Sequence, residues 1–258
     1  MNKYSILVAL IFLTLVFVSC EDEEDFSKKL YLGGKVSVYY TFSDSAGTDF
    51  YEKKEEQYGM PIRFQMFENG TYSKDVIADS WGYILNVGVS EGKEYQLKLI
   101  IEDEVLFESK IYTPKISESK YAEEGSTKVD FLPRSGLRIG NHFELKDFDM
   151  RIENNPDRLF VRPNPFVSKT ILDIMLTSSN TFSVDVYNLF GDKYEVFDSD
   201  ILEPYIKLPV DVNSAQLNAD SLPQGNYIFR MKSGNETFYQ MAVRDSSGYT
   251  TLDSIPRN

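Results

Sequence analysis

Two residue types that commonly carry nucleophilic or metal chemistry occur only once each, as Cys20 and His142. A single cysteine excludes a disulfide framework and a thiolate zinc site, and a single histidine excludes a multi-histidine metal centre. A serine nucleophile needs a neighbouring histidine as its base, and the sequence has no G-x-S-x-G turn to present one. His142 is therefore interpreted as a loop or edge-strand residue. The sequence predicts no catalytic residue, no metal site and no cofactor, and thus a protein that is not an enzyme.

Carboxylates are abundant, because 40 Asp and Glu stand against 27 Lys and Arg, for a net charge of −13. A glycosidase needs a pair of carboxylates, but among so many acidic residues no pair stands out. The acidic stretches 44–49 and 198–200 could offer oxygens to calcium. Neither has the spacing of an EF-hand, so solvated loops are the preferred interpretation. The negative balance argues against a nucleic-acid partner, which requires a basic face.

The start of the chain gives Cys20 a role. Lys3 is followed by an apolar run from Ile6 to Val18, which is shorter than a membrane span of about 20 residues and is typical of a secretory signal peptide. The small residue Ser19 directly before Cys20 resembles the lipobox of bacterial lipoproteins. That resemblance implies a signal peptide at 1–19 and a lipid on the Cys20 thiol that holds the mature chain to a membrane. An ordinary signal peptide that ends near a cysteine, or a short membrane anchor, is the alternative.

An unbroken acidic run follows this cysteine. It consists of Glu21, Asp22, Glu23, Glu24 and Asp25. Because like charges repel and cannot pack, the segment 20–29 is expected to be a solvated tether. The run resembles the export signal of surface-exposed lipoproteins in bacteria of the gliding, glycan-degrading phylum, which implies display on the outer membrane surface. A stalk without an addressing role is the alternative.

Period-two alternation of apolar and polar residues is common in the rest of the chain and predicts antiparallel strands. In Glu94–Ile101 every second residue is apolar, and Leu172–Leu176 and Phe182–Val186 show the same pattern. Turn signals such as Asn69-Gly70 separate these short runs. The expected fold is therefore all-β, with two antiparallel immunoglobulin-like β-sandwich modules after the lipoprotein signal peptide.

The expected modules span 30–115 and 158–244. The segment 116–157 between them is predicted to be a linker, with extra strands expected near Lys128–Leu132 and Phe143–Phe148. A tail follows at 245–258.

The second module, 158–244, resembles the sorting domain of type IX secretion cargo. The resemblance rests on a P-N-P segment, a Y-x-x-x-G turn and an L-x-x-G-x-Y segment. The residues concerned are Pro163, Asn164, Pro165, Gly191, Gly225 and Tyr227. Prolines stiffen the approach to a first strand, and glycines permit tight turns. The resemblance implies an immunoglobulin-like sandwich that either docks to the secretion machinery or serves as a second structural domain. A generic sandwich with the same turn rules is the alternative.

The first module resembles, more loosely, transthyretin-like and carboxypeptidase-regulatory-like sandwiches. The matching segments are G-M-P-I-R-F at 59–64, D-S-W-G-Y at 79–83 and G-K-E-Y-Q-L at 92–97. The resemblance implies a spacer or interaction domain without catalysis. Trp81, the only Trp, is expected to cap the end of the core. Stacking on a sugar or on a partner's side chain is the alternative, which makes Trp81 the candidate ligand contact.

The predicted function is that of a non-catalytic, lipid-anchored protein of the outer membrane surface with a binding or scaffolding role. Its expected partners are the membrane, through the lipid, and either type IX secretion machinery or another envelope protein. One alternative is a soluble type IX cargo whose C-terminal domain directs export and is then removed. A second alternative is a glycan-binding accessory lipoprotein of a polysaccharide-uptake system.

Overall fold

A computed structural model of the chain describes residues 25–43, 50–56, 60–132, 136–152, 159–162, 164–167, 169–175, 182–194, 212–218, 222–233 and 235–245. Across these ranges most residues lie in β-strands and none lies in an α-helix, so the predicted all-β class is confirmed. The two helical segments are short 3-10 turns, η1 (Phe26–Lys28) and η2 (Ile116–Glu118). In this described part no helix is long and apolar enough to cross a membrane.

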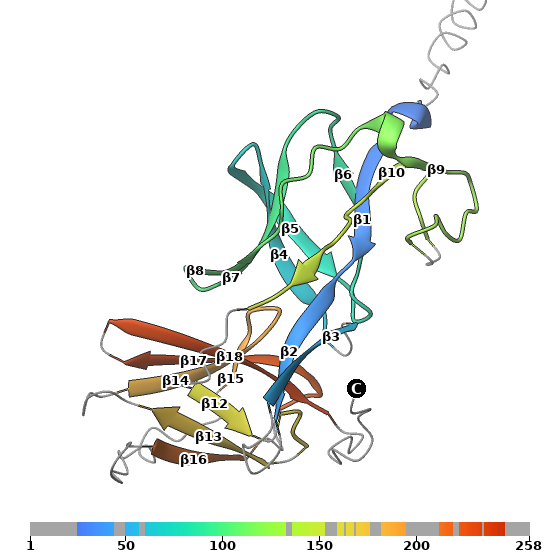
Figure 1. The fold of residues 1–258 in the computed structure, drawn as a ribbon. Helices are drawn as coiled ribbons and strands as arrows, with labels where there is room; N and C mark the ends of the chain where they lie inside the picture. Colours follow the sequence, from blue (N-terminus) through green and yellow to red (C-terminus); the bar gives the residue numbers. More distant parts are fainter. Residues whose placement is uncertain are drawn as a thin grey trace, which may run out of the picture.

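Residues 25–152, called the N-terminal part below, form three sheets, and most of their strands lie in the upper half of Figure 1. Their strand orders are β6-β1-β10-β9, β11-β2-β3 and β5-β4-β7-β8. The strands are β1 (Leu30–Lys35), β2 (Ser37–Ser43), β3 (Phe50–Glu56), β4 (Ile62–Glu68), β5 (Thr71–Ala78), β6 (Tyr83–Val89), β7 (Tyr95–Ile101), β8 (Glu104–Glu108), β9 (Lys120–Ala122), β10 (Gly140–Glu144) and β11 (Asp149–Met150).

Alternation placed the best-defined strands correctly. In β7 the residues Tyr95, Leu97, Leu99 and Ile101 are buried while those between them are only partly covered, as the period of two requires. At the start of the N-terminal part, β1 and β2 follow one another directly and pair in different sheets on either side of Val36.

The segment 116–157 was expected to be a linker, and the portion of it that is described belongs to the N-terminal sheets. β10 lies between β1 and β9 and runs parallel to β1, and β11 runs parallel to β2. The side chains of Leu145, Phe148, Met150 and Ile152 are buried. Gly34 at the end of β1 allows the backbone at Leu145 to approach closely, because an added Cβ at Gly34 would lie 2.8 Å from Leu145 Cβ. The strand expected near 128–132 is only an isolated bridge between Val129 and Leu132.

Residues 159–245, called the C-terminal part below, form two sheets with strand orders β12-β13-β16 and β15-β14-β17-β18. The strands are β12 (Leu159–Arg162), β13 (Lys169–Met175), β14 (Phe182–Asn188), β15 (Lys193–Tyr194), β16 (Val212–Asn218), β17 (Gly225–Ser233) and β18 (Glu236–Arg244). They occupy the lower half of Figure 1, where the β2–β3 hairpin descends beside them.

The two largest groups of packed apolar side chains differ in where their members come from. Core 2 collects buried residues of the C-terminal part from both of its sheets, among them Val161, Leu172 and Phe229. Core 1 fills the N-terminal part but also includes four residues of the C-terminal part. These are Tyr187, Leu189, Ile228 and Met241. Core 1 therefore extends across both parts, whereas core 2 lies in the C-terminal part.

Candidate functional site

The residues expected to carry the lipid and the export signal lie mostly outside the described residues. Cys20 and the acidic residues 21–24 belong to that segment, and Asp25 is the first residue described. Asp25 caps η1, because its Oδ1 accepts a hydrogen bond from Ser27 N at 3.2 Å. Lys28 Nζ lies 2.9 Å from Asp25 Oδ2. The hydrogen bonds from Ser27 and Lys28 lower the pKa of this exposed carboxyl.

His142 is neither a loop residue nor an edge-strand residue, which corrects the interpretation from sequence. It lies on the inner strand β10 and is completely buried. Its ring packs on Tyr31 with centroids 5.3 Å apart, and its Nε2 lies 2.9 Å from Arg138 O. Burial lowers the pKa of His142, so the ring is neutral near pH 7 and has no contact with solvent.

In the ranges that the structure covers, no three His, Cys, Asp or Glu side chains come together where a metal ion could be held. The two acidic stretches considered for calcium, 44–49 and 198–200, lie outside those ranges.

Trp81 lies on the turn between β5 and β6. Asp79 Oδ1 accepts hydrogen bonds from Trp81 N at 2.8 Å and from Tyr83 N at 3.0 Å, and Gly82 completes the turn at φ +82°. This geometry explains the spacing of the D-S-W-G-Y segment. The Trp81 side chain is 54% exposed, so it does not close the core as expected. An exposed indole can stack on a ligand or a partner.

The sorting-type residues gather where the two parts meet, although Pro163 lies outside the described residues. Asn164 precedes Pro165 in a cis peptide bond and is buried. Its Nδ2 donates to Thr41 O of the N-terminal part at 2.6 Å and to Met241 O at 3.0 Å. Its Oδ1 accepts from Val243 N at 2.9 Å. The side-chain amide of Asn164 thus links β2 to β18.

The motif glycines and Tyr227 meet the start of β4. An added Cβ at Gly191 would lie 2.7 Å from Arg63 Nη2, and one at Gly225 would lie 2.8 Å from Met60 Cγ. The hydroxyl of Tyr227 lies 3.8 Å from Met60 Sδ, and burial raises the pKa of Tyr227. The turn residues that resemble a sorting signal therefore form contacts inside the molecule.

We call the contact surface between the two parts the junction. Across its apolar side, Tyr187, Ile228 and Met241 are adjacent in register on β14, β17 and β18. Arg63 N donates to Leu189 O at 3.1 Å, and the Arg63 guanidinium lies 5.2 Å from the Phe190 ring centroid.

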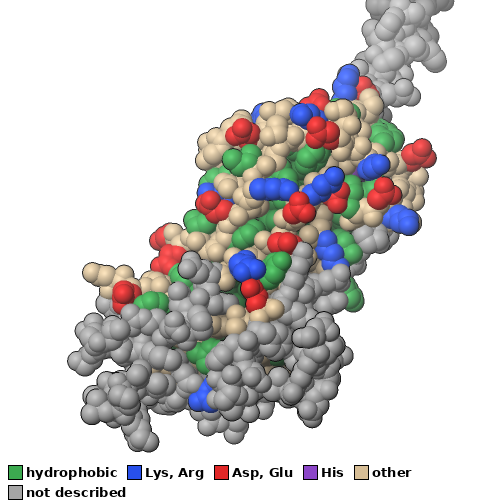
Figure 2. Space-filling model, in the orientation of Figure 1, with side chains coloured by type: hydrophobic (Ala, Val, Ile, Leu, Met, Phe, Trp, Pro, Cys, Tyr) green, Lys and Arg blue, Asp and Glu red, His purple; other side chains and the backbone are tan. Residues whose placement is uncertain are grey.

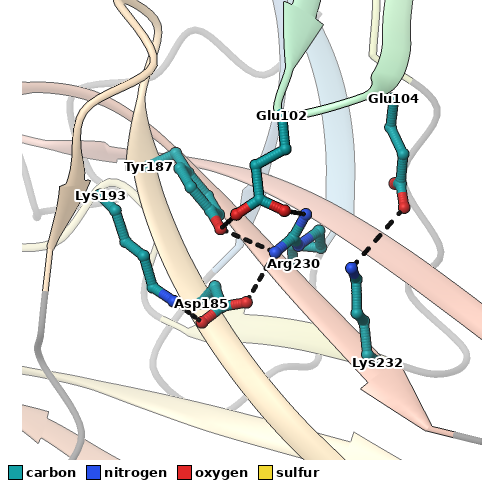
Figure 3. Close-up of polar contacts among 7 residues, drawn as sticks. All are labelled: Glu102, Glu104, Asp185, Tyr187, Lys193, Arg230 and Lys232. Carbon is teal, nitrogen blue, oxygen red and sulfur yellow. Dashed lines mark hydrogen bonds and ion pairs between the residues drawn. The ribbon is translucent and has the colours of Figure 1, made fainter.

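The polar side of the junction centres on Arg230, whose side chain is 3% exposed (Figure 3). Arg230 Nη1 donates to Glu102 Oε2 at 2.8 Å, and Nη2 donates to Asp185 Oδ2 and to the Tyr187 hydroxyl at 2.7 Å each. Tyr187 in turn donates to Glu102 Oε1 at 2.6 Å. Glu102 follows β7 in the N-terminal part, so this network joins the two parts.

The charges of the junction are well compensated. Hydrogen bonds from Arg230 and Tyr187 lower the pKa of Glu102 to about 2. Lys193 lies 2.7 Å from Asp185, and together with Arg230 it outweighs the effect of burial and lowers the pKa of Asp185. Burial raises the pKa of Tyr187. Both carboxylates are ionised near neutral pH, so Arg230 is held between two negative charges.

Sequence reasoning missed this network. Arg230 occupies a polar position in the alternation of β17, between the buried Phe229 and Met231. Such a position normally faces water. The available signal was the residue type, because Arg is favoured over Lys where a charge is buried against carboxylates.

Comparison of the chain with protein-family models, with curated proteins and with solved structures finds no match.

Proposed function

We propose that the chain is a lipid-anchored protein of the outer membrane surface with a non-catalytic binding or scaffolding role. In this proposal its two parts are β-sandwich modules of immunoglobulin-like type, held together as one block. The lipid on Cys20 provides the anchor, and the acidic run Glu21–Asp25 provides the tether and the export signal.

The position of the first described residues supports an anchor at one end. η1 lies at the end of the N-terminal part that is remote from the C-terminal part (Figure 1). A tether attached there leaves the C-terminal part farthest from the membrane. The exposed surface of both parts is then free to contact envelope partners.

The junction is the observation that carries the proposal. Removal of the C-terminal part would take Tyr187, Leu189, Ile228 and Met241 out of core 1 and would expose their apolar partners to water. It would also leave Glu102 without Arg230. A retained structural module fits these contacts, whereas a soluble cargo that loses its sorting domain on export would lose them.

Metabolic labelling with palmitate tests the anchor, combined with the intact mass of the labelled protein. We expect label on the wild type, none on Cys20→Ala, and full label on the matched control Ser19→Ala, which keeps a small residue before the cysteine. The labelled product should retain the C-terminal part. An unlabelled wild type that is released without its C-terminal part would support the cargo alternative instead.

Glycan binding is a second candidate. Exposed aromatic side chains on β5 and on the turn that follows it favour this role. Tyr72 is 52% exposed on β5 and packs edge-on against Phe67 of β4, with centroids 6.2 Å apart. Trp81 follows at the other end of β5. Affinity electrophoresis on a glycan panel tests this role. Retardation that is lost in Tyr72→Ala or Trp81→Ala, and kept in the equally exposed Ile77→Ala, would support it. No retardation on any glycan would remove it.

A further inference from the structure

A cavity of about 390 Å³ lies at the tether end of the N-terminal part, beside η1. It opens between the start of β1, the β4–β5 hairpin and the end of β6, and the loop before β10 reaches it. The charged residues of its lining are Lys28, Lys29, Glu68, Lys74 and Arg138, and its hydroxyl-bearing residues are Tyr31, Ser73, Ser90 and Tyr95. Four cationic side chains thus line it beside one carboxylate, in a chain of net charge −13.

The single carboxylate, Glu68, is already engaged by a cation from outside this lining, Lys93. Glu68 Oε1 lies 2.5 Å from the Nζ of Lys93, and Glu68 Oε2 accepts from the Tyr95 hydroxyl at 3.1 Å. The hydrogen bond from Lys93 lowers the pKa of Glu68. The lining therefore holds more cationic than anionic side chains, whereas Figure 2 shows both signs of charge mixed over the visible face of the N-terminal part.

The ammonium of Lys74 is held by a backbone carbonyl, and the backbone of Arg138 is held by two side chains. Lys74 Nζ donates to Gly88 O at 2.8 Å, and an ammonium carries further N–H groups beyond that one. Arg138 N donates to Asn86 Oδ1 at 2.9 Å, and Arg138 O lies 2.9 Å from His142 Nε2. The loop is therefore fixed to β6 and β10. Lys28 pairs with Asp25, but the two side chains are 81% and 49% exposed, so this pair contributes little.

We propose that this cavity binds a phosphate-bearing group. Ammonium groups act as point charges toward phosphate and a guanidinium offers two parallel N–H donors, while the hydroxyl of Ser73 adds a further donor. The volume fits a small phosphorylated ligand. A phosphorylated lipid headgroup and a soluble phosphorylated molecule share this chemistry.

Binding of a lipid headgroup rests on the proposed lipid anchor at Cys20. The segment from Cys20 to Asp25 spans at most about 3.6 Å per residue, so an anchored chain would hold the cavity close to the headgroups. The soluble source needs no anchor.

The test uses the full chain with Cys20→Ala in every protein, so that failure of lipidation does not affect it and the contribution of residues 1–24 cancels. The cavity variant carries Lys28→Gln, Lys74→Gln and Arg138→Gln. The matched control carries Lys110→Gln, Lys146→Gln and Arg151→Gln, which removes equal charge at side chains that are 50%, 70% and 59% exposed elsewhere on the N-terminal part.

Titration calorimetry with inorganic phosphate and glycerol 1-phosphate tests the soluble source. Flotation with phosphatidylglycerol vesicles, against phosphatidylcholine vesicles, tests the lipid source. We expect binding in at least one arm, a loss of affinity of tenfold or more in the cavity variant, and a change below twofold in the control. Equal losses in both variants would show general charge attraction and overturn the proposal, as would the absence of binding in both arms. Unchanged circular dichroism in the cavity variant establishes that it is folded.

Discussion

The two apolar cores differ in how far each depends on the other part of the molecule. Core 2 draws its buried members from the C-terminal part alone, and Met60 is its partly buried contact from the N-terminal part. Core 1 instead takes buried residues from both parts. The C-terminal part therefore has a core of its own, whereas the N-terminal core is completed by its neighbour. This asymmetry indicates that the N-terminal part depends on the C-terminal part for stability.

The comparison is sharpest in β17, where adjacent residues serve different cores. Phe229 is buried in core 2 and Ile228 in core 1. We expect Phe229→Ala to lower the free energy of unfolding by about 3–5 kcal/mol and Ile228→Ala by about 2–5 kcal/mol, because each leaves a cavity. Urea unfolding followed by circular dichroism measures both. A loss below about 1 kcal/mol for Ile228→Ala, as at an exposed site, would show that the junction is not packed.

Breaking the polar side of the junction should have the next largest effect. Arg230→Met leaves Asp185, 17% exposed, and Glu102, 48% exposed, without their guanidinium. We expect the free energy of unfolding, measured in urea, to fall by about 2–3 kcal/mol. This is at or below the lower end of the roughly 3–5 kcal/mol typical of a broken buried ion pair, because Glu102 is half exposed. The matched control is Lys232→Met, whose ammonium lies 4.0 Å from Glu104 at the surface. It should cost less than about 1 kcal/mol, and equal losses would contradict the special role of Arg230.

An effect of equal or smaller size is expected at the glycines. Gly225 has φ +153° and its Cβ position is filled by Met60, whereas Gly70 has φ +80° and nothing within 4 Å. Gly70→Ala should cost about 1–2 kcal/mol through backbone strain alone. Gly225→Ala should cost about 1 kcal/mol more, because Met60 must also move. Thermal unfolding compares the two, and equal losses would show that the contact with Met60 is unimportant.

Acid should weaken the junction modestly. The pKa of Glu102 is lowered from 4.5 to about 2 in the folded chain, so its stabilising contribution is complete above pH 4.5 and is lost as the pH falls toward 2. Because the side chain is half exposed, we expect this contribution to be only about 1 kcal/mol. Urea unfolding at pH 6 and pH 3 should show a smaller acid loss in Glu102→Gln than in the wild type. The same loss in both would assign the acid sensitivity to other carboxylates.

Local sequence patterns predicted single strands well, but they predicted poorly how distant strands pair and how the two parts contact each other. The alternation in Tyr95–Ile101 gave the bounds and the buried face of β7 because one side of that strand faces water or loops. The parallel pairing of β10 with β1 joins residues more than a hundred positions apart, such as Leu30 and Asn141. No local pattern encodes such a pairing, and for this reason 116–157 was interpreted as a linker and His142 as peripheral.

The candidate site was predicted only in part, for the same physical reason. The turn rules correctly identified Gly191 and Gly225 as positions that need glycine, both at positive φ. What lies against them could not be predicted, because Arg63 and Met60 come from the other part. Likewise, β17 alternates as if one face were solvated, yet Ile228 and Arg230 are buried by the N-terminal part. The lipid anchor at Cys20 stays a prediction.

The central claim is that the C-terminal part is a permanent structural partner of the N-terminal part. Trp81 tests it directly, because the only Trp of the chain reports on the N-terminal part. Urea unfolding followed by Trp81 fluorescence should shift to lower urea in Phe229→Ala by the same amount as the circular dichroism transition. A Trp81 transition that stays at the wild-type midpoint while the circular dichroism shifts would show two independent units and contradict the account.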